Sequence, residues 1–219
     1  MGSTITPSIE CSLCNDTGWI VEGRTARKCK CLEAAYKRIK LAELSAQSGL
    51  RGALLHKTFE NFIPKTKSQK VALEKVTSGK NFFLIGPWGT GKTHLLAASV
   101  NDAIRRGVDA VFFSVPWLLK IIREDLFSNR PIGILERVCE VEYLALDDLG
   151  KEKPSETVQE KMFMIFDRRE IDGLRTSVTS NYVPETLVNE KLDGAIIDRI
   201  IGMCDVILLE GDSHRKEKK

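Results

Sequence analysis

The segment from Gly86 to Thr93, GPWGTGKT, is the feature that most constrains what this chain can fold into. It fits the pattern G-x-x-x-x-G-K-[ST], in which glycines let backbone amides curl around phosphate oxygens. An apolar run at 81–85 precedes it and predicts a strand, and an amphipathic run at 92–106, ended by Gly107, predicts a helix. A strand, a glycine-rich turn and a helix N-terminus in this order predict a nucleotide phosphate site.

The motif also predicts what each of its residues contacts. Lys92 is expected to reach the β- and γ-phosphates of ATP, and the Thr93 hydroxyl is expected to hold Mg²⁺. The expected residues that bind ATP or ADP are Gly86, Pro87, Gly89, Thr90, Gly91, Lys92, Thr93 and His94. No histidine is interpreted as a metal ligand.

A second apolar run, 141–148, ends in the adjacent carboxylates Asp147 and Asp148. If this strand ends beside the phosphate loop, Asp147 can hold Mg²⁺ through water and Asp148 can orient the attacking water. A further strand, 174–178, leads to Asn181, whose amide would lie between the carboxylates and the γ-phosphate. The alternative for Asn181 is a strand-end cap, because asparagine favours turns. Together with the loop, these residues predict an ATPase.

Four of the six cysteines fall within the first 31 residues, in the pattern C-x2-C followed by C-x-C. They are Cys11, Cys14, Cys29 and Cys31. No apolar segment near the N-terminus indicates secretion, so the cluster predicts a tetrahedral, structural zinc site. A redox or disulfide site is the alternative. Cys139 and Cys204 stand in apolar surroundings and are expected to be small buried side chains.

The chain of 219 residues has room for one ordinary domain and something smaller. We expect a zinc-binding module with a helical linker at 1–52 and a nucleotide-binding domain at 53–219, with a flexible joint at 48–52. A helix is predicted at 32–47, and the basic residues at 28–40 form either a solvated face or a partner surface. No apolar run is long enough to span a bilayer.

The remaining pattern predicts an α/β fold with a five-stranded parallel sheet flanked by helices. Further strands are expected at 108–115 and 206–209, and further helices are expected at 68–78, 116–126, 134–138, 155–171, 184–191 and 193–201. Pro116 is predicted at the first helical position. Phe59 and Phe62, just before the loop, are either core residues or neighbours of the adenine ring.

The motifs in order, GPWGTGKT, LALDDLG, TSN, DRI and GDSHR, resemble those of the DnaC/DnaI-type replicative helicase loaders, a branch of the AAA+ ATPases. The segments CNDTGW, CKC and TFENF resemble the zinc-bearing loaders of Gram-positive bacteria and their phages. The resemblance extends from Cys11 to Arg215.

This resemblance implies a role for further residues. Asn181 matches sensor 1, Arg199 matches an arginine finger that reaches the γ-phosphate of a neighbouring subunit, and Arg215 matches sensor 2. The implied catalytic residues are Lys92, Asp147, Asp148, Asn181, Arg199 and Arg215. The helices at 116–139 match an insertion that lines a single-stranded DNA path, and the zinc module matches the part that docks on the helicase. A helical lid domain is not expected. Asp148 stands where most AAA+ proteins have glutamate, so hydrolysis is expected to be slow and stimulated by assembly.

The expected function is therefore an ATP-dependent loader that places a hexameric replicative helicase on single-stranded DNA in the bacterial cytoplasm. The alternatives are a transposition helper of the IstB type, a nucleotide-gated binding module with little turnover and, more distantly, a small-molecule kinase. Selective binding of long duplex DNA would favour the IstB type. Trp117, Lys120 and Arg123 are the candidate DNA contacts; packing and solvated charge are the alternatives.

Overall fold

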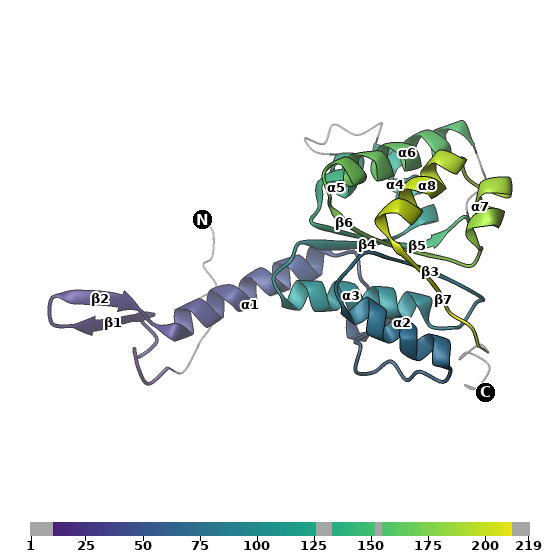
Figure 1. Cartoon of the computed structure of the whole chain (residues 1–219). Coiled ribbons are helices and arrows are strands. Elements are labelled where there is room, and N and C mark those ends of the chain that lie inside the picture. The colour runs from purple at the N-terminus through teal and green to yellow at the C-terminus, as the bar shows by residue number, and fades with distance from the viewer. Residues whose placement is uncertain (1–10, 126–132, 152–154, 212–219) are drawn as a thin grey trace.

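The computed structural model describes residues 11–125, 133–151 and 155–211. Its centre is a five-stranded sheet in the order β4-β5-β6-β3-β7, in which every pairing is parallel (Figure 1). This confirms the predicted fold class. The strands are β3 (Phe82–Ile85), β4 (Ala110–Ser114), β5 (Tyr143–Leu149), β6 (Arg175–Ser180) and β7 (Asp205–Leu208).

Helices cover both faces of this sheet (Figure 1). One face carries α1, α2 and α3, and the other carries α4, α5, α6 and α8, with α7 packed beside α8. Their bounds are α1 (Lys30–Gln47), α2 (Lys67–Thr77), α3 (Lys92–Arg105), α4 (Val115–Asp125), α5 (Ile134–Glu140), α6 (Glu156–Ile171), α7 (Pro184–Glu190) and α8 (Gly194–Met203). Because α4 begins at Val115, Pro116 is its second residue and not its first as predicted.

Alternating residues of the central strands fill two separate cores. In β3, Phe83 belongs to the core under α4, α6 and α8, whereas Phe82 and Leu84 belong to the core under α2 and α3. In β5, Leu146 belongs to the first of these cores and Ala145 belongs to the second. Both faces are therefore apolar, as expected of a parallel sheet covered by helices. The carboxyl ends of the parallel strands lie together, and polar side chains gather there.

A hairpin arm projects away from this body (Figure 1). The strands β1 (Trp19–Glu22) and β2 (Thr25–Lys28) pair antiparallel at the outer end of α1, whose other end packs against α3. The second strand, TARK, was not predicted, because all four of its residues are exposed and only one is apolar.

The segment after α1 is packed, which corrects the prediction of a flexible joint. Ser48 and Leu50 are buried, and the Ser48 carbonyl accepts a 2.7 Å hydrogen bond from the Phe112 amide in β4. A short 3₁₀ helix, η1 (Gly52–His56), follows and contacts α3. Among the described residues, no helix combines the length and apolar character that crossing a membrane would require.

Candidate nucleotide and metal sites

The predicted phosphate loop connects β3 to α3. Gly91 adopts a φ of 100°, and a Cβ there would lie 2.5 Å from the Phe62 ring, so only glycine fits. Thr90 is buried, and its carbonyl accepts a 3.1 Å hydrogen bond from the Gln69 amide group at the start of α2. The loop is therefore held from outside by α2 and by Phe62.

Lys92, the first residue of α3, is buried at the base of this loop. Its Nζ donates hydrogen bonds of 2.7 Å to the carbonyl oxygens of Gly86 and Pro87. The ammonium group thus lies within the turn, beside the amino end of α3, where partial positive charge favours an anion.

Thr93 and Asp147 meet although 54 positions separate them in sequence. The Thr93 hydroxyl lies 3.1 and 3.0 Å from the two carboxylate oxygens of Asp147. A hydroxyl and a carboxylate are hard oxygen ligands of the kind that Mg²⁺ takes, usually with waters and substrate phosphates completing its shell. The donor set therefore fits the predicted metal.

Asp147 is held from the neighbouring strand β6 as well. The Thr179 hydroxyl in β6 donates a 2.5 Å hydrogen bond to Asp147 Oδ1 and accepts one of 3.1 Å from the Asp148 amide. Sequence reasoning did not select Thr179. The available signal was a threonine two residues before Asn181, near the end of the strand that leads to it.

Burial raises the pKa of the Asp147 carboxyl, and the neighbouring Asp148 adds to this, while hydrogen bonds from Thr179 and Thr93 oppose it. A raised pKa means that the fold disfavours the ionised form. The resulting destabilisation is present at neutral pH and disappears as the pH falls and the carboxyl takes up a proton.

We therefore expect Asp147→Asn to raise the Tm of the nucleotide-free protein at pH 7 by about 2 °C or more, because it removes a buried charge. The same change should weaken Mg²⁺-dependent nucleotide binding. Calorimetry with and without Mg²⁺-ATP measures both effects, and Asp205→Asn, at an exposed carboxylate, is the matched control. A lower Tm for Asp147→Asn would contradict the prediction.

Asp148 occupies an irregular position in β5. The pairing of β5 with β6 shifts register between Leu146 and Leu149, and Asp148 has a φ of 64°. Its side chain accepts a 2.6 Å hydrogen bond from Lys151 Nζ and a longer one, 3.4 Å, from Asn181 Nδ2. The structure thus brings Asp148 and Asn181 together, as predicted, and adds Lys151.

The two aromatic residues before the loop are packed into the protein. Phe62 is buried, lies edge-on to the His94 ring at 5.2 Å, and belongs with Leu95 to the core beneath α3. His94 Nε2 lies 2.8 Å from Asn61 Oδ1. These contacts favour the core interpretation of Phe62. They also connect His94, in the first turn of α3, to the segment that contains Asn61 and Phe62.

Arg199 lies on α8 and is engaged by α6. Its guanidinium bonds Asp167 Oδ1 at 2.8 and 3.1 Å, approaches Glu170 at 3.5 Å and covers the Phe163 ring. None of these contacts involves the phosphate loop. Arg215 lies outside the described residues.

Of the three residues on α4 that were predicted to contact DNA, two contact each other. Lys120 Nζ lies 4.8 Å from the centre of the half-exposed Trp117 ring, and Arg123 Nε donates to the Leu119 carbonyl. This arrangement agrees with solvated charge as well as with a nucleic-acid contact.

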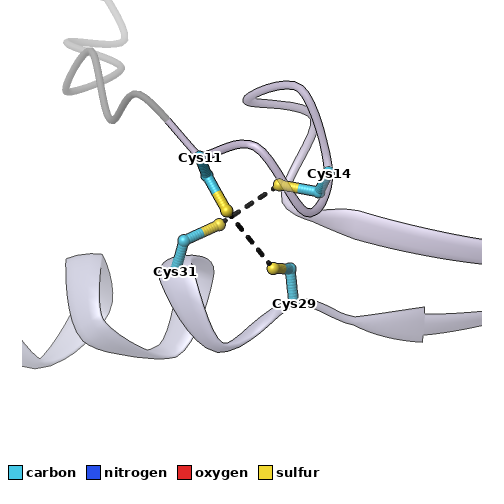
Figure 2. A group of neighbouring side chains, drawn as sticks. All are labelled: Cys11, Cys14, Cys29 and Cys31. Carbon is cyan, nitrogen blue, oxygen red and sulfur yellow. Dashed lines mark hydrogen bonds between the residues drawn. The ribbon is translucent and has the colours of Figure 1, made fainter.

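The four N-terminal cysteines converge where the hairpin meets the outer end of α1 (Figure 2). Their Sγ atoms all lie within 4.8 Å of one another, with 3.7 Å between Cys11 and Cys29 and 3.3 Å between Cys14 and Cys31. Sulfurs placed tetrahedrally about 2.3 Å from a Zn²⁺ ion would be about 3.8 Å apart. The donor set therefore fits one zinc ion, and all four thiols are free.

The titration of these thiols reflects their crowding. Burial acts to raise the pKa of Cys14, but hydrogen bonds from Cys31 and the Gly18 amide together lower it to about 7. The hydrogen bond with Cys14, followed by burial, raises the pKa of Cys31. Four neighbouring thiols cannot all ionise without a cation among them.

Comparison with known proteins agrees with this geometry. The model of the family "IstB-like ATP binding protein" matches residues 20–219. An IS21-like putative ATP-binding protein of Bacteroides fragilis is 30% identical over 152 residues, which are 66% of this chain and 56% of that protein. The replicative helicase loader DnaC of Escherichia coli K12 is 26% identical over 196 residues, which are 84% of this chain and 79% of that protein.

The fold has solved counterparts too. A crystal structure of the DnaC helicase loader superposes with a TM-score of 0.67 at 23% identity, covering 73% of this chain and all of that one. The predicted resemblance to helicase loaders is thereby confirmed, and the sheet has the AAA+ fold. Because the family model matches nearly all of the chain from β1 onward, the protein belongs to the IstB-like ATP-binding protein family.

Proposed function

We propose that this protein is an ATPase that hydrolyses ATP slowly and does so fastest within an assembly. The observation that carries the proposal is the convergence of Thr93, Asp147 and Asp148 at the end of a phosphate loop that contains a buried lysine. Lys92 would neutralise the β- and γ-phosphates, and Thr93 with Asp147 would hold Mg²⁺, which balances charge on the transferring phosphoryl group.

In this proposal, Asp148 accepts a proton from the attacking water as the bond between the γ-phosphorus and the bridging oxygen breaks, giving ADP and phosphate. Asn181, hydrogen-bonded to Asp148, would orient that water or the γ-phosphate. Since Asp148 is one methylene shorter than glutamate and stands on a constrained backbone, we expect modest turnover, suited to a switch.

The task we propose for this ATPase is loading a hexameric replicative helicase onto single-stranded DNA in the bacterial cytoplasm. Support comes from the similarity to a replicative helicase loader and from the cysteine cluster on a projecting arm. The arm would dock on the helicase, and zinc would hold the arm folded. Cys11 and Cys14 precede the region matched by the family model, so the cluster reaches beyond the shared ATP-binding region.

A second candidate is supported by the insertion-sequence relatives, one of which is 30% identical. A transposition helper would bind long duplex DNA and would not need a helicase. A nucleotide-gated binding module would bind ATP and its protein or DNA partner, but that partner would not stimulate ATP turnover.

Gel filtration with the replicative helicase of the encoding organism separates these functions. A loader co-elutes with the helicase in at least one of the ATP, ADP and nucleotide-free states, and its ATPase rises with helicase and single-stranded DNA. Absence of co-elution in every state, together with stimulation by long duplex DNA, would assign the transposition role instead.

We further propose that Arg199 acts on the γ-phosphate of a neighbouring subunit. Support comes from its place on α8, held by Asp167 and away from its own phosphate loop. Because a finger supplied by another subunit is worth about 10³–10⁵ in rate, isolated chains would turn over slowly.

Mixing two inactive variants tests this arrangement. Arg199→Ala lacks the finger and Asp148→Asn lacks the base, so each is expected to be slow alone. Equimolar mixing should restore a measurable fraction of wild-type ATPase, because some pockets would combine an intact base with an intact finger. If the mixed rate is only the average of the two, Arg199 does not act across subunits.

A further inference from the structure

Asp148 carries an ion pair that was not anticipated from the ATPase motifs. Lys151 Nζ lies 2.6 Å from Asp148 Oδ2, while Asn181 Nδ2 lies 3.4 Å from Oδ1. Both oxygens of the proposed base therefore already accept hydrogen bonds from the chain itself. A charge-assisted bond of this length is among the stronger kinds of hydrogen bond.

The backbone turn that follows Asp148 brings Lys151 back over it. Gly150 has a φ of 86°, and a Cβ there would lie 2.5 Å from the Leu187 side chain and 3.1 Å from the Tyr182 ring. Glycine is therefore required at this position. The Lys151 amide then approaches the Asp148 carbonyl at 3.4 Å, which closes the turn and places the two side chains on the same side.

Asp148 has little freedom to leave this arrangement by moving its backbone. Its φ of 64° is uncommon for a residue with a side chain, and its amide is bonded to Thr179 Oγ1 at 3.1 Å. With the backbone held, Asp148 would turn its carboxylate towards a water by rotating its side chain, away from the present bond to Lys151.

We propose that Lys151 is a positioning residue that holds Asp148 in a resting orientation and restrains ATP turnover by the isolated chain. This inference rests on the proposed ATPase function. It assigns to Lys151 no contact with nucleotide and no part in proton transfer. The side chains of Lys151 and Asp148 are partly exposed, at 40% and 26%, so the restraint is moderate and reversible.

The test compares Lys151→Gln with wild type in single-chain conditions, with ATP affinity measured alongside kcat and KM. We expect Lys151→Gln to raise kcat by about two- to fivefold, with little change in KM, because binding is untouched and only the base is released. The conservative Lys151→Arg should bring the rate back towards the wild-type value. Lys80→Gln, at an exposed lysine before β3, is the matched control.

A double variant shows whether the effect passes through Asp148. Lys151→Gln combined with Asp148→Asn should be as slow as Asp148→Asn alone. A fall or no change in kcat for Lys151→Gln, or an increase that survives in the double variant, would overturn the inference. Failure of the proposed ATPase function is distinguishable, since wild type itself would then neither bind nor hydrolyse ATP.

Discussion

Lys92→Gln is expected to abolish productive nucleotide binding and to lower ATP turnover by at least about a hundredfold. The lysine is buried within the phosphate loop and its ammonium group already bonds the carbonyls of Gly86 and Pro87. Glutamine is similar in length but brings no charge to set against the β- and γ-phosphates. The loss should therefore appear in affinity and in rate together.

The loop contains its own reporter for this experiment. Trp88, between Pro87 and Gly89, is 64% exposed, so its fluorescence should change when phosphate fills the loop. Titration with Mg²⁺-ATP should give a saturable change in wild type and in the control Lys80→Gln, and none in Lys92→Gln. Trp88→Phe identifies which of the three tryptophans carries the signal. Saturable binding by Lys92→Gln with wild-type turnover would refute the assignment of this loop.

Cys29→Ser is expected to remove bound zinc and to unfold the arm while the thermal transition of the body around the five-stranded sheet persists. Cys29 is buried, its amide donates a 2.8 Å hydrogen bond to the Gly18 carbonyl, and it stands at the start of α1. The hairpin buries little apolar surface. Metal coordination, on the order of 10–16 kcal/mol in small zinc domains, would therefore supply most of its folding free energy.

Metal analysis and limited proteolysis measure this loss. Wild type should carry about one zinc ion per chain and resist cleavage at 11–47, whereas Cys29→Ser or chelated protein should be metal-free and cleaved there. Cys139→Ala, at a cysteine outside the cluster, should keep its zinc. Metal-free wild type with a mass lower by two hydrogen atoms for each thiol pair would instead show disulfides.

The elements of the nucleotide-binding body could be predicted from sequence because their signals are local. The helix at 92–106 was expected and α3 spans Lys92–Arg105. The helix at 155–171 was expected, and α6 spans Glu156–Ile171 with Ser155 as its N-cap. Asp147 and Thr93 also meet as expected, because the loop motif follows β3 and Asp147 lies near the end of β5, the next strand but one in the sheet.

What could not be predicted depends on contacts between distant segments. A flexible joint was expected at 48–52, but Ser48 packs against β4. Serine and glycine are common both in exposed loops and in buried connections, so the local sequence did not distinguish the two. Thr179 contacts Asp147 because β5 and β6 pair in a particular register, and the sequence does not specify that register. Lys151 reaches Asp148 only because Gly150 turns the chain back.

The arm has a mechanical consequence that follows from its single helix. With 18 residues, α1 is about 27 Å long, and only its inner end is fixed to the body. A tilt of about ten degrees at that end would carry the cysteine cluster through about 5 Å. The hydrogen bond from Phe112 to Ser48 ties this pivot to β4, the strand beside the one that bears Asp147. Any small displacement of β4 that tilted this end of α1 would therefore be magnified at the outer end, where the cysteine cluster lies.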